Sequence, residues 1–102
     1  MVVASSYVSD LVAAAELLRA LGHPLRLAIV LQVRDEERCV HELVDRLGAS
    51  QPLISQHLKV LRSVGVLSAA KRGRETAYSV ADDHVLHIAL DAITHADEGN
   101  LP

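Results

Sequence analysis

The chain has 102 residues, half of them apolar, and its only aromatic side chains are two tyrosines, so we expect a single domain with an aliphatic core. No apolar run is long enough to span a membrane, no secretory signal is recognisable and one cysteine cannot form an intrachain disulfide, which predicts a cytoplasmic protein without a membrane partner. The net charge of −3 argues against nucleic acid, but residues 46–74 carry six cations and no acid.

The first third of the chain predicts two helices. Residues 5–20 form a helix with a wide apolar face, and Gly22-His23-Pro24 ends it. A second helix runs from Pro24 to Gln32, and residues 34–38 follow as a solvated turn. The apolar positions of the first helix are Val8, Leu11, Val12, Ala15, Leu18 and Leu21. A small aliphatic chain with such helices often buries part of this surface in a dimer.

The middle of the chain predicts a helix-turn-helix over about residues 40–63. A short helix from Val40 to Leu47 is closed by Gly48, and Ser50 caps the next helix, which has Pro52 in its first turn. The expected buried positions of this second helix are Leu53, Ile54, Leu58 and Leu61. Its opposite face carries Gln51, Ser55, Gln56, Lys59 and Arg62, with no carboxylate to repel DNA. We therefore interpret it as a DNA-recognition helix.

A β-hairpin follows over about residues 66–80. Gly65 stops the helix, residues 66–70 and 75–80 read as strands, and Lys71-Arg72-Gly73-Arg74 lies between them as a cationic turn. A hairpin directly after a helix-turn-helix is a wing. The whole chain, residues 1–102, is thus expected to be one winged helix-turn-helix domain, mainly α with a small β-hairpin.

The predicted DNA contacts fall into two groups. Gln51, Ser55 and Gln56 would contact base edges, whereas phosphates would be held by Ser50, Lys59, Arg72 and Arg74. Two alternatives stay open: Arg72 and Arg74 could form only a solubilising hairpin tip, and His57 could contact DNA or cover the contact between helices.

The tail, about residues 82–98, predicts an acidic helix capped by Asp82 or Asp83. His84 and His95 share a face, but at about 1.5 Å per residue they lie about 16 Å apart, too far to bind one ion. His95 and Glu98 can chelate together, and so can Asp82 and His84 if Asp82 lies in the cap. Two antiparallel tail helices would unite these pairs in two four-ligand sites per dimer. The alternative is a solvated acidic face with incidental histidines.

The chain resembles the ArsR/SmtB family of metal-sensing winged-helix repressors at residues 18–29, 39–43, 50–62, 71–80 and 82–84. The resemblance implies a homodimer through the first and last helices, which binds double-stranded operator DNA without metal and releases it when metal binds. Asp82, His84, His95 and Glu98 match the family's tail-helix ligand pattern. These ligands favour zinc, with cobalt or nickel as further options.

Three other readings are weaker. Cys39 and Glu42 match part of a second metal site in the family, but residues 1–10 lack the Cys or His that would complete it, so Cys39 is expected to be a buried small residue. No nucleophile–base pair or phosphate loop indicates an enzyme. A winged-helix protein-interaction module, or a sensor of another signal such as redox or a different metal, is the alternative function.

Overall fold

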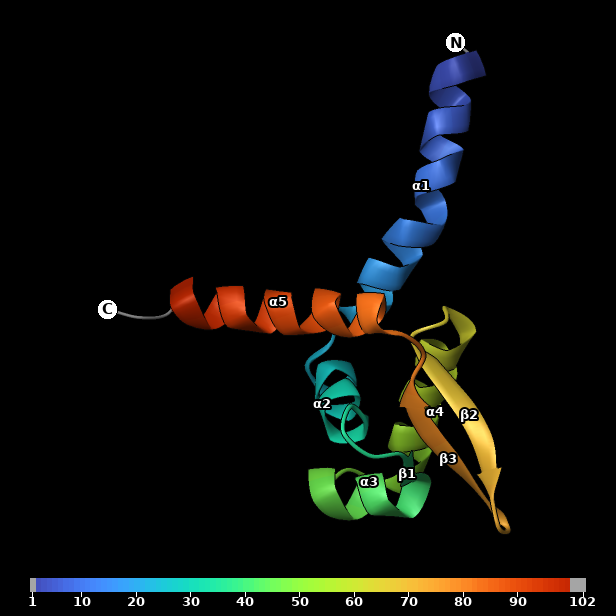
Figure 1. Cartoon of the computed structure of the whole chain (residues 1–102), viewed down its shortest axis with the longest axis vertical. Helices are drawn as coiled ribbons and strands as arrows, with labels where there is room; N and C mark the ends of the chain where they lie inside the picture. The colour runs from blue at the N-terminus through green and yellow to red at the C-terminus, as the bar shows by residue number, and fades with distance from the viewer. Residues whose placement is uncertain (1, 100–102) are drawn as a thin grey trace.

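The computed structural model describes residues 2–99, and the surroundings of side chains from residue 7 onward. The elements in chain order are α1 (Val2–Leu21), α2 (Pro24–Val33), β1 (Arg38–Cys39), α3 (Val40–Leu47), α4 (Gln51–Ser63), β2 (Leu67–Arg72), β3 (Glu75–Val80) and α5 (Asp83–Gly99) (Figure 1). The predicted fold class, a mainly helical winged helix-turn-helix, is confirmed.

The core lies where α2, α3 and α4 meet the sheet. Its fully buried side chains are aliphatic: Ile29, Val30, Leu43, Ile54, Leu58, Leu61 and Val66. The tight connection between α3 and α4 depends on Gly48, which adopts φ +67, a left-handed conformation that glycine reaches without steric cost. This turn fixes α4 across α3, as the predicted helix-turn-helix requires.

The recognition helix α4 begins as expected, but its buried stripe is shifted. The Oγ atom of Ser50 accepts a hydrogen bond from the Leu53 N–H at 3.4 Å, which caps the helix. Leu53 was predicted to be buried and is 40% exposed, because it lies at the edge of the stripe in the first turn. The buried positions are Ile54, His57, Leu58 and Leu61.

The sheet has three antiparallel strands in the order β1-β3-β2, whereas only the hairpin was predicted. Arg38 and Cys39 form β1 and pair with Tyr78 and Ala77 of β3, so Arg38 does not belong to the solvated turn. The strand β2 also continues further than expected, through Arg72. This leaves a two-residue turn in which Gly73 has φ +65.

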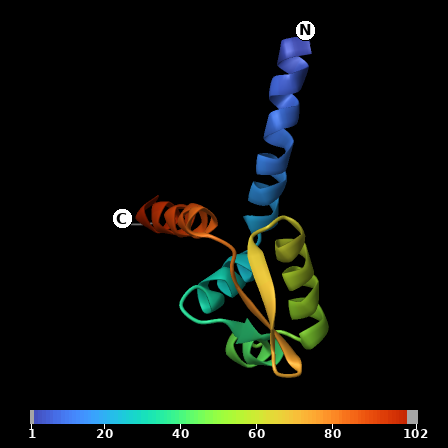
Figure 2. The same ribbon diagram turned by 45° about the vertical axis from the view of Figure 1, so that its right-hand side comes forward.

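The helices α1 and α5 extend away from the winged core in both views (Figures 1 and 2). Much of their apolar surface has no partner within the described chain. The exposed large apolar side chains on these helices are Tyr7, Val8, Leu11, Val12, Leu18 and Ile88. None of the described helices combines the length and the hydropathy that a bilayer crossing needs.

Candidate nucleic-acid interface and metal ligands

The outward face of α4 presents polar and cationic side chains to solvent. Gln51, Ser55, Gln56, Lys59 and Arg62 are all exposed, and Ser50 is exposed at the cap. In the described part of the chain, Lys59 and Arg62 take part in no ion pair. The face therefore offers amide and hydroxyl groups near the start of the helix and unneutralised cations toward its end.

A groove separates α4 from the wing and adds residues that the sequence did not single out as DNA contacts. Ser55, Lys59 and Arg62 line one hollow together with Tyr78 of β3. Arg62 also lines an adjoining hollow with Lys71 and Thr76. Thr76 and Tyr78 are two residues apart on one strand, so they share a face of the sheet. This alternation along residues 75–80 is the sequence pattern from which the two groove residues could have been predicted.

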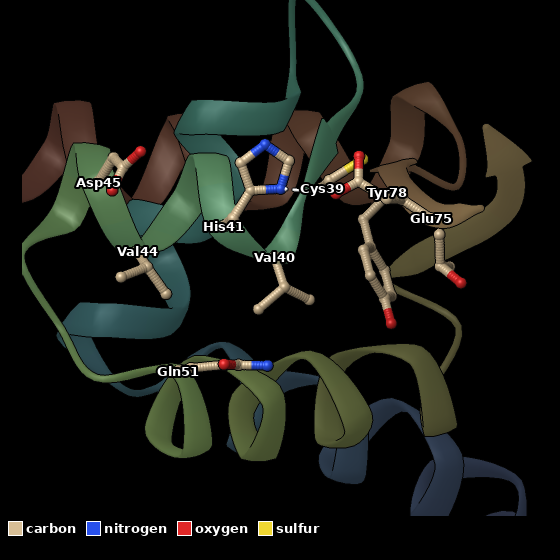
Figure 3. A pocket seen from close by; sticks show the side chains of 9 residues that line it. Cys39, Val40, His41, Val44, Asp45, Gln51, Glu75 and Tyr78 are labelled. Atoms are coloured by element: carbon tan, nitrogen blue, oxygen red, sulfur yellow. Dashed lines mark ion pairs between the residues drawn. The ribbon is translucent and has the colours of Figure 1, made fainter. Parts of the chain in front are cut away.

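A second hollow lies beside α3, and acidic side chains form part of its lining (Figure 3). There a cavity of about 390 Å³ lies between α3, the start of α4 and β3. Its walls include Asp45, Gln51 and Tyr78, and the Nδ1 atom of His41 lies 2.9 Å from Oε1 of Glu75. The carboxylates of Asp45 and Glu75 would repel phosphate at this hollow, whereas Lys59 and Arg62 would attract it at the other.

Arg72 does not stand free as a phosphate contact. Its guanidinium forms an ion pair with Glu42 of α3 and lies 4.0 Å from Oε1 of Glu37. The pKa of Glu42 is lowered, first by the hydrogen bond from the Cys39 N–H and then by Arg72. Among the described residues, Arg74 at the hairpin tip and Lys71 of β2 are exposed and take part in no ion pair, so both remain available as wing cations.

Cys39 is a buried side chain, as expected, with 1% exposure. Burial raises the pKa of its thiol, and a hydrogen bond with Glu75 raises it further. A thiol in this state is a poor nucleophile and a poor metal ligand, because both roles require the thiolate. Cys39 is instead the N-cap residue of α3, and its N–H donates to Oε1 of Glu42 at 2.8 Å.

For His57, the structure supports the contact between helices over the contact with DNA. The side chain is only 5% exposed and turns toward α2. Its Nδ1 atom accepts a hydrogen bond from Nε of Arg26 at 3.0 Å, and its ring lies 4.5 Å from the ring of His23. Helical periodicity could not reveal this, because Arg26 is 31 residues away in the chain.

The four predicted metal ligands lie in two separate pairs, one at each end of α5. Oδ1 of Asp82 accepts a hydrogen bond from the Val85 N–H at 2.9 Å, so Asp82 is the cap. Nδ1 of His84 lies 3.9 Å from that oxygen, wider than the roughly 3.3 Å between neighbouring ligand atoms of a tetrahedral zinc ion with bonds of about 2 Å. The exposed His84 side chain would therefore have to turn closer to Asp82 for the two to share one ion. His95 and Glu98 are exposed near the other end of α5. Within residues 2–99 no three metal-ligating side chains come together.

Comparison with known proteins places this arrangement among bacterial regulators. The family model described as "Bacterial regulatory protein, arsR family" matches residues 23–69. The transcriptional repressor SmtB of Mycobacterium tuberculosis is 59% identical over 86 residues, which cover 84% of this chain and 64% of SmtB. The chain thus spans a little under two thirds of the length of that relative.

A second relative and a solved structure agree with this placement. The transcriptional regulator NmtR of Mycobacterium tuberculosis is 36% identical over 85% of this chain and 72% of its own length. A homodimeric winged helix-turn-helix DNA-binding domain from Mycobacterium bovis is 26% identical and superposes with a TM-score of 0.85, covering 92% of this chain and 87% of that domain.

Proposed function

This chain belongs to the ArsR/SmtB family of bacterial regulatory proteins, and we propose on this basis that it is a metal-responsive transcriptional repressor acting in the cytoplasm. A homodimer would bind an inverted-repeat operator in double-stranded DNA, and zinc or a similar divalent ion would release it. Members of the family are regulators and not enzymes. The observation that carries the DNA-binding part is the exposed face of α4, whose cations pair with no carboxylate in the described part of the chain.

The assignment of DNA contacts follows from the groove. Gln51, Ser55 and Gln56 would contact base edges in the major groove, because amide and hydroxyl groups match the donors and acceptors displayed there. Phosphates would lie along the cationic side of the groove and at the wing tip. The proposed phosphate contacts are Ser50, Lys59, Arg62, Lys71 and Arg74.

The exposed apolar surfaces of α1 and α5 support a dimer. Leu11 and Val12 are each about half exposed, at 48% and 49%, and Val8 at 62%. Complete burial of an exposed side chain of this kind is worth about 1.5–3 kcal/mol, so covering these partly exposed ones with a second copy would gain roughly half of that for each. The solved domain from Mycobacterium bovis, which is homodimeric, has the same fold.

The metal-binding part of the proposal depends on α5. Asp82 and His84 of one chain, with His95 and Glu98 of the other, would supply four oxygen and nitrogen ligands, which suits zinc. The bound ion would supply a cross-link between the two tail helices. Such a cross-link can set the separation of the two α4 helices, and DNA affinity depends on that separation because successive major grooves lie about 34 Å apart. By linkage, DNA lowers metal affinity by the same factor.

The test is a zinc titration of the protein bound to fluorescent duplex, with anisotropy as the readout. The duplex is an inverted repeat that the protein selects from a random pool in the absence of metal. We expect tight, salt-sensitive binding without zinc and release with zinc. His95→Ala should bind DNA normally and lose the zinc response, whereas His87→Ala, one turn from His84, should retain it.

Two outcomes contradict the proposal in different ways. Zinc release that survives His95→Ala excludes the tail site and points to another signal or another metal site. Binding that shows neither a preference for inverted repeats nor a steep dependence on salt excludes the repressor and favours a winged-helix protein-interaction module.

A further inference from the structure

One arginine joins the last turn of α1 to the buried side of α4. Nη1 of Arg26, in α2, donates to the backbone carbonyl of Ala20 at 3.2 Å. Nε of the same guanidinium donates to Nδ1 of His57 at 3.0 Å. Because a guanidinium is planar and rigid, the two hydrogen bonds fix the carbonyl of α1 and the imidazole of α4 relative to each other.

His57 is held on its other side as well. Its ring is tilted by 47° against the ring of His23, with 4.5 Å between the centroids. His23 is itself fixed as the cap of α2, where its Nδ1 accepts the Leu25 N–H at 3.1 Å. The imidazole of His57 therefore has little freedom, and a shift of α1 against α2 would be transmitted to α4 through these contacts.

This contact lies between a surface on α1 and a surface on α4. Ala20 is 3% exposed and belongs to the helix whose outer part carries the uncovered side chains Leu11 and Val12. His57 follows Gln56 directly and precedes Lys59 by two residues, and both of these face outward on α4. Arg26 itself is half buried behind α4, so it does not belong to the outward face.

We propose that Arg26 is a positioning residue: by bridging the Ala20 carbonyl and the His57 imidazole it sets the orientation of α4 relative to α1, and hence the separation of the two recognition helices in the dimer. This inference rests on the proposed function, since it concerns DNA binding by a dimer. It differs from a phosphate contact, which would act equally on every duplex, and from a purely stabilising contact.

The experiment compares affinities for three duplexes: the selected inverted repeat, the same repeat with one base pair inserted between its arms, and a version with one arm scrambled. Wild-type protein should prefer the first. Arg26→Lys removes the two-point contact but keeps the charge. It should reduce that preference by about tenfold, a common size for coupling between sites, and should leave affinity for the scrambled duplex unchanged.

Two companion variants separate positioning from mere stability. His57→Asn keeps an acceptor oxygen near the place of Nδ1 and should retain the preference, whereas His57→Leu removes the acceptor and should lose it. Arg19→Lys, at the end of α1, is the matched control and should match wild type. Thermal unfolding and sedimentation establish that each variant is a folded dimer, and if Arg26→Lys does not fold, the His57 pair gives the same comparison.

Other outcomes overturn the inference. An unchanged preference in Arg26→Lys and His57→Leu means that the contact is only structural. An equal loss on all three duplexes with a smaller salt slope means that Arg26 contacts phosphate. If wild type itself shows no preference for the intact repeat, the proposed function fails, which is a distinct result.

Discussion

Glu42 and Arg72 join the wing to the helix-turn-helix. The carboxylate oxygen of Glu42 that pairs with the Arg72 guanidinium also accepts the N–H of Cys39, the N-cap residue of α3. The end of β2 is thereby held against the first turn of α3. This contact explains why Arg72 belongs to β2 and not to the turn of the hairpin, whereas Arg74 lies in the turn and is exposed.

Glu42→Gln should lower the midpoint of thermal unfolding by a few degrees and weaken operator binding, because the neutral amide no longer pairs with Arg72 and the wing loses its anchor. Arg72→Gln should have the same effect, and the double variant should lose little more than either single one, since both remove one contact. Glu36→Gln is the control, because the carboxylate of Glu36 is 65% exposed where it pairs with Arg38, with 3.6 Å between the charged atoms. Additive losses would instead assign Arg72 a separate contact with DNA.

Gln51 and Lys59 should differ in how they affect DNA recognition. Gln51→Ala should cost about 1–3 kcal/mol on the preferred site and relax the preference at one base position, because it removes a base contact. Lys59→Ala should weaken binding similarly on all sequences and lower the salt slope by about one. Binding-site selection and salt titrations measure these effects. Arg34→Ala, beside Asp35 in the turn after α2, should change neither.

If the exposed apolar face of α1 forms the dimer interface, a single charge introduced into that face should dissociate the dimer. Leu11→Asp places a carboxylate in the middle of this face and should shift the sedimentation profile to monomer. Ala13→Asp adds the same charge about 200° around the helix and should remain dimeric. A Leu11→Asp protein that stays dimeric would locate the interface elsewhere.

Mixed dimers test whether each metal site is shared between subunits. In a dimer of one His84→Ala chain and one His95→Ala chain, both substitutions fall in the same predicted site and the other site stays intact. We therefore expect one tightly bound zinc ion per mixed dimer and none in either variant homodimer, measured by native mass spectrometry. If each chain instead formed a site from its own ligands alone, both chains of the mixed dimer would lack one ligand. The mixed dimer would then bind no zinc ion tightly.

The sequence predicted what depends on local periodicity and missed what depends on long-range contacts. The bounds of α3 and the Ser50 cap follow from neighbouring residues, and both are confirmed. β1 was missed because two residues carry no period, and only pairing with β3 defines them. The roles of Arg72 and His57 were open for the same reason: their partners, Glu42 and Arg26, lie about thirty residues away.

His57 also predicts how stability depends on pH. Its pKa is lowered by burial and by the positive charges of His23 and Arg26, so the folded chain takes up this proton only below the ordinary histidine value of about 6.5. Between these two pKa values the unfolded chain binds more protons, and the free energy of unfolding therefore falls as the pH falls. A difference of one proton limits this slope to about 1.4 kcal/mol per pH unit.

Urea unfolding at pH values from about 7.5 down to about 5, an interval that spans the ordinary titration range of histidine, measures this slope. His57→Asn keeps the acceptor for Arg26 but cannot take up a proton, so its stability should decline less over this range than that of wild type. His87→Asn removes an exposed histidine from α5 and should follow the wild-type curve. Parallel curves for wild type and His57→Asn would show that protonation of His57 costs nothing, which contradicts a hydrogen bond that requires an unprotonated Nδ1.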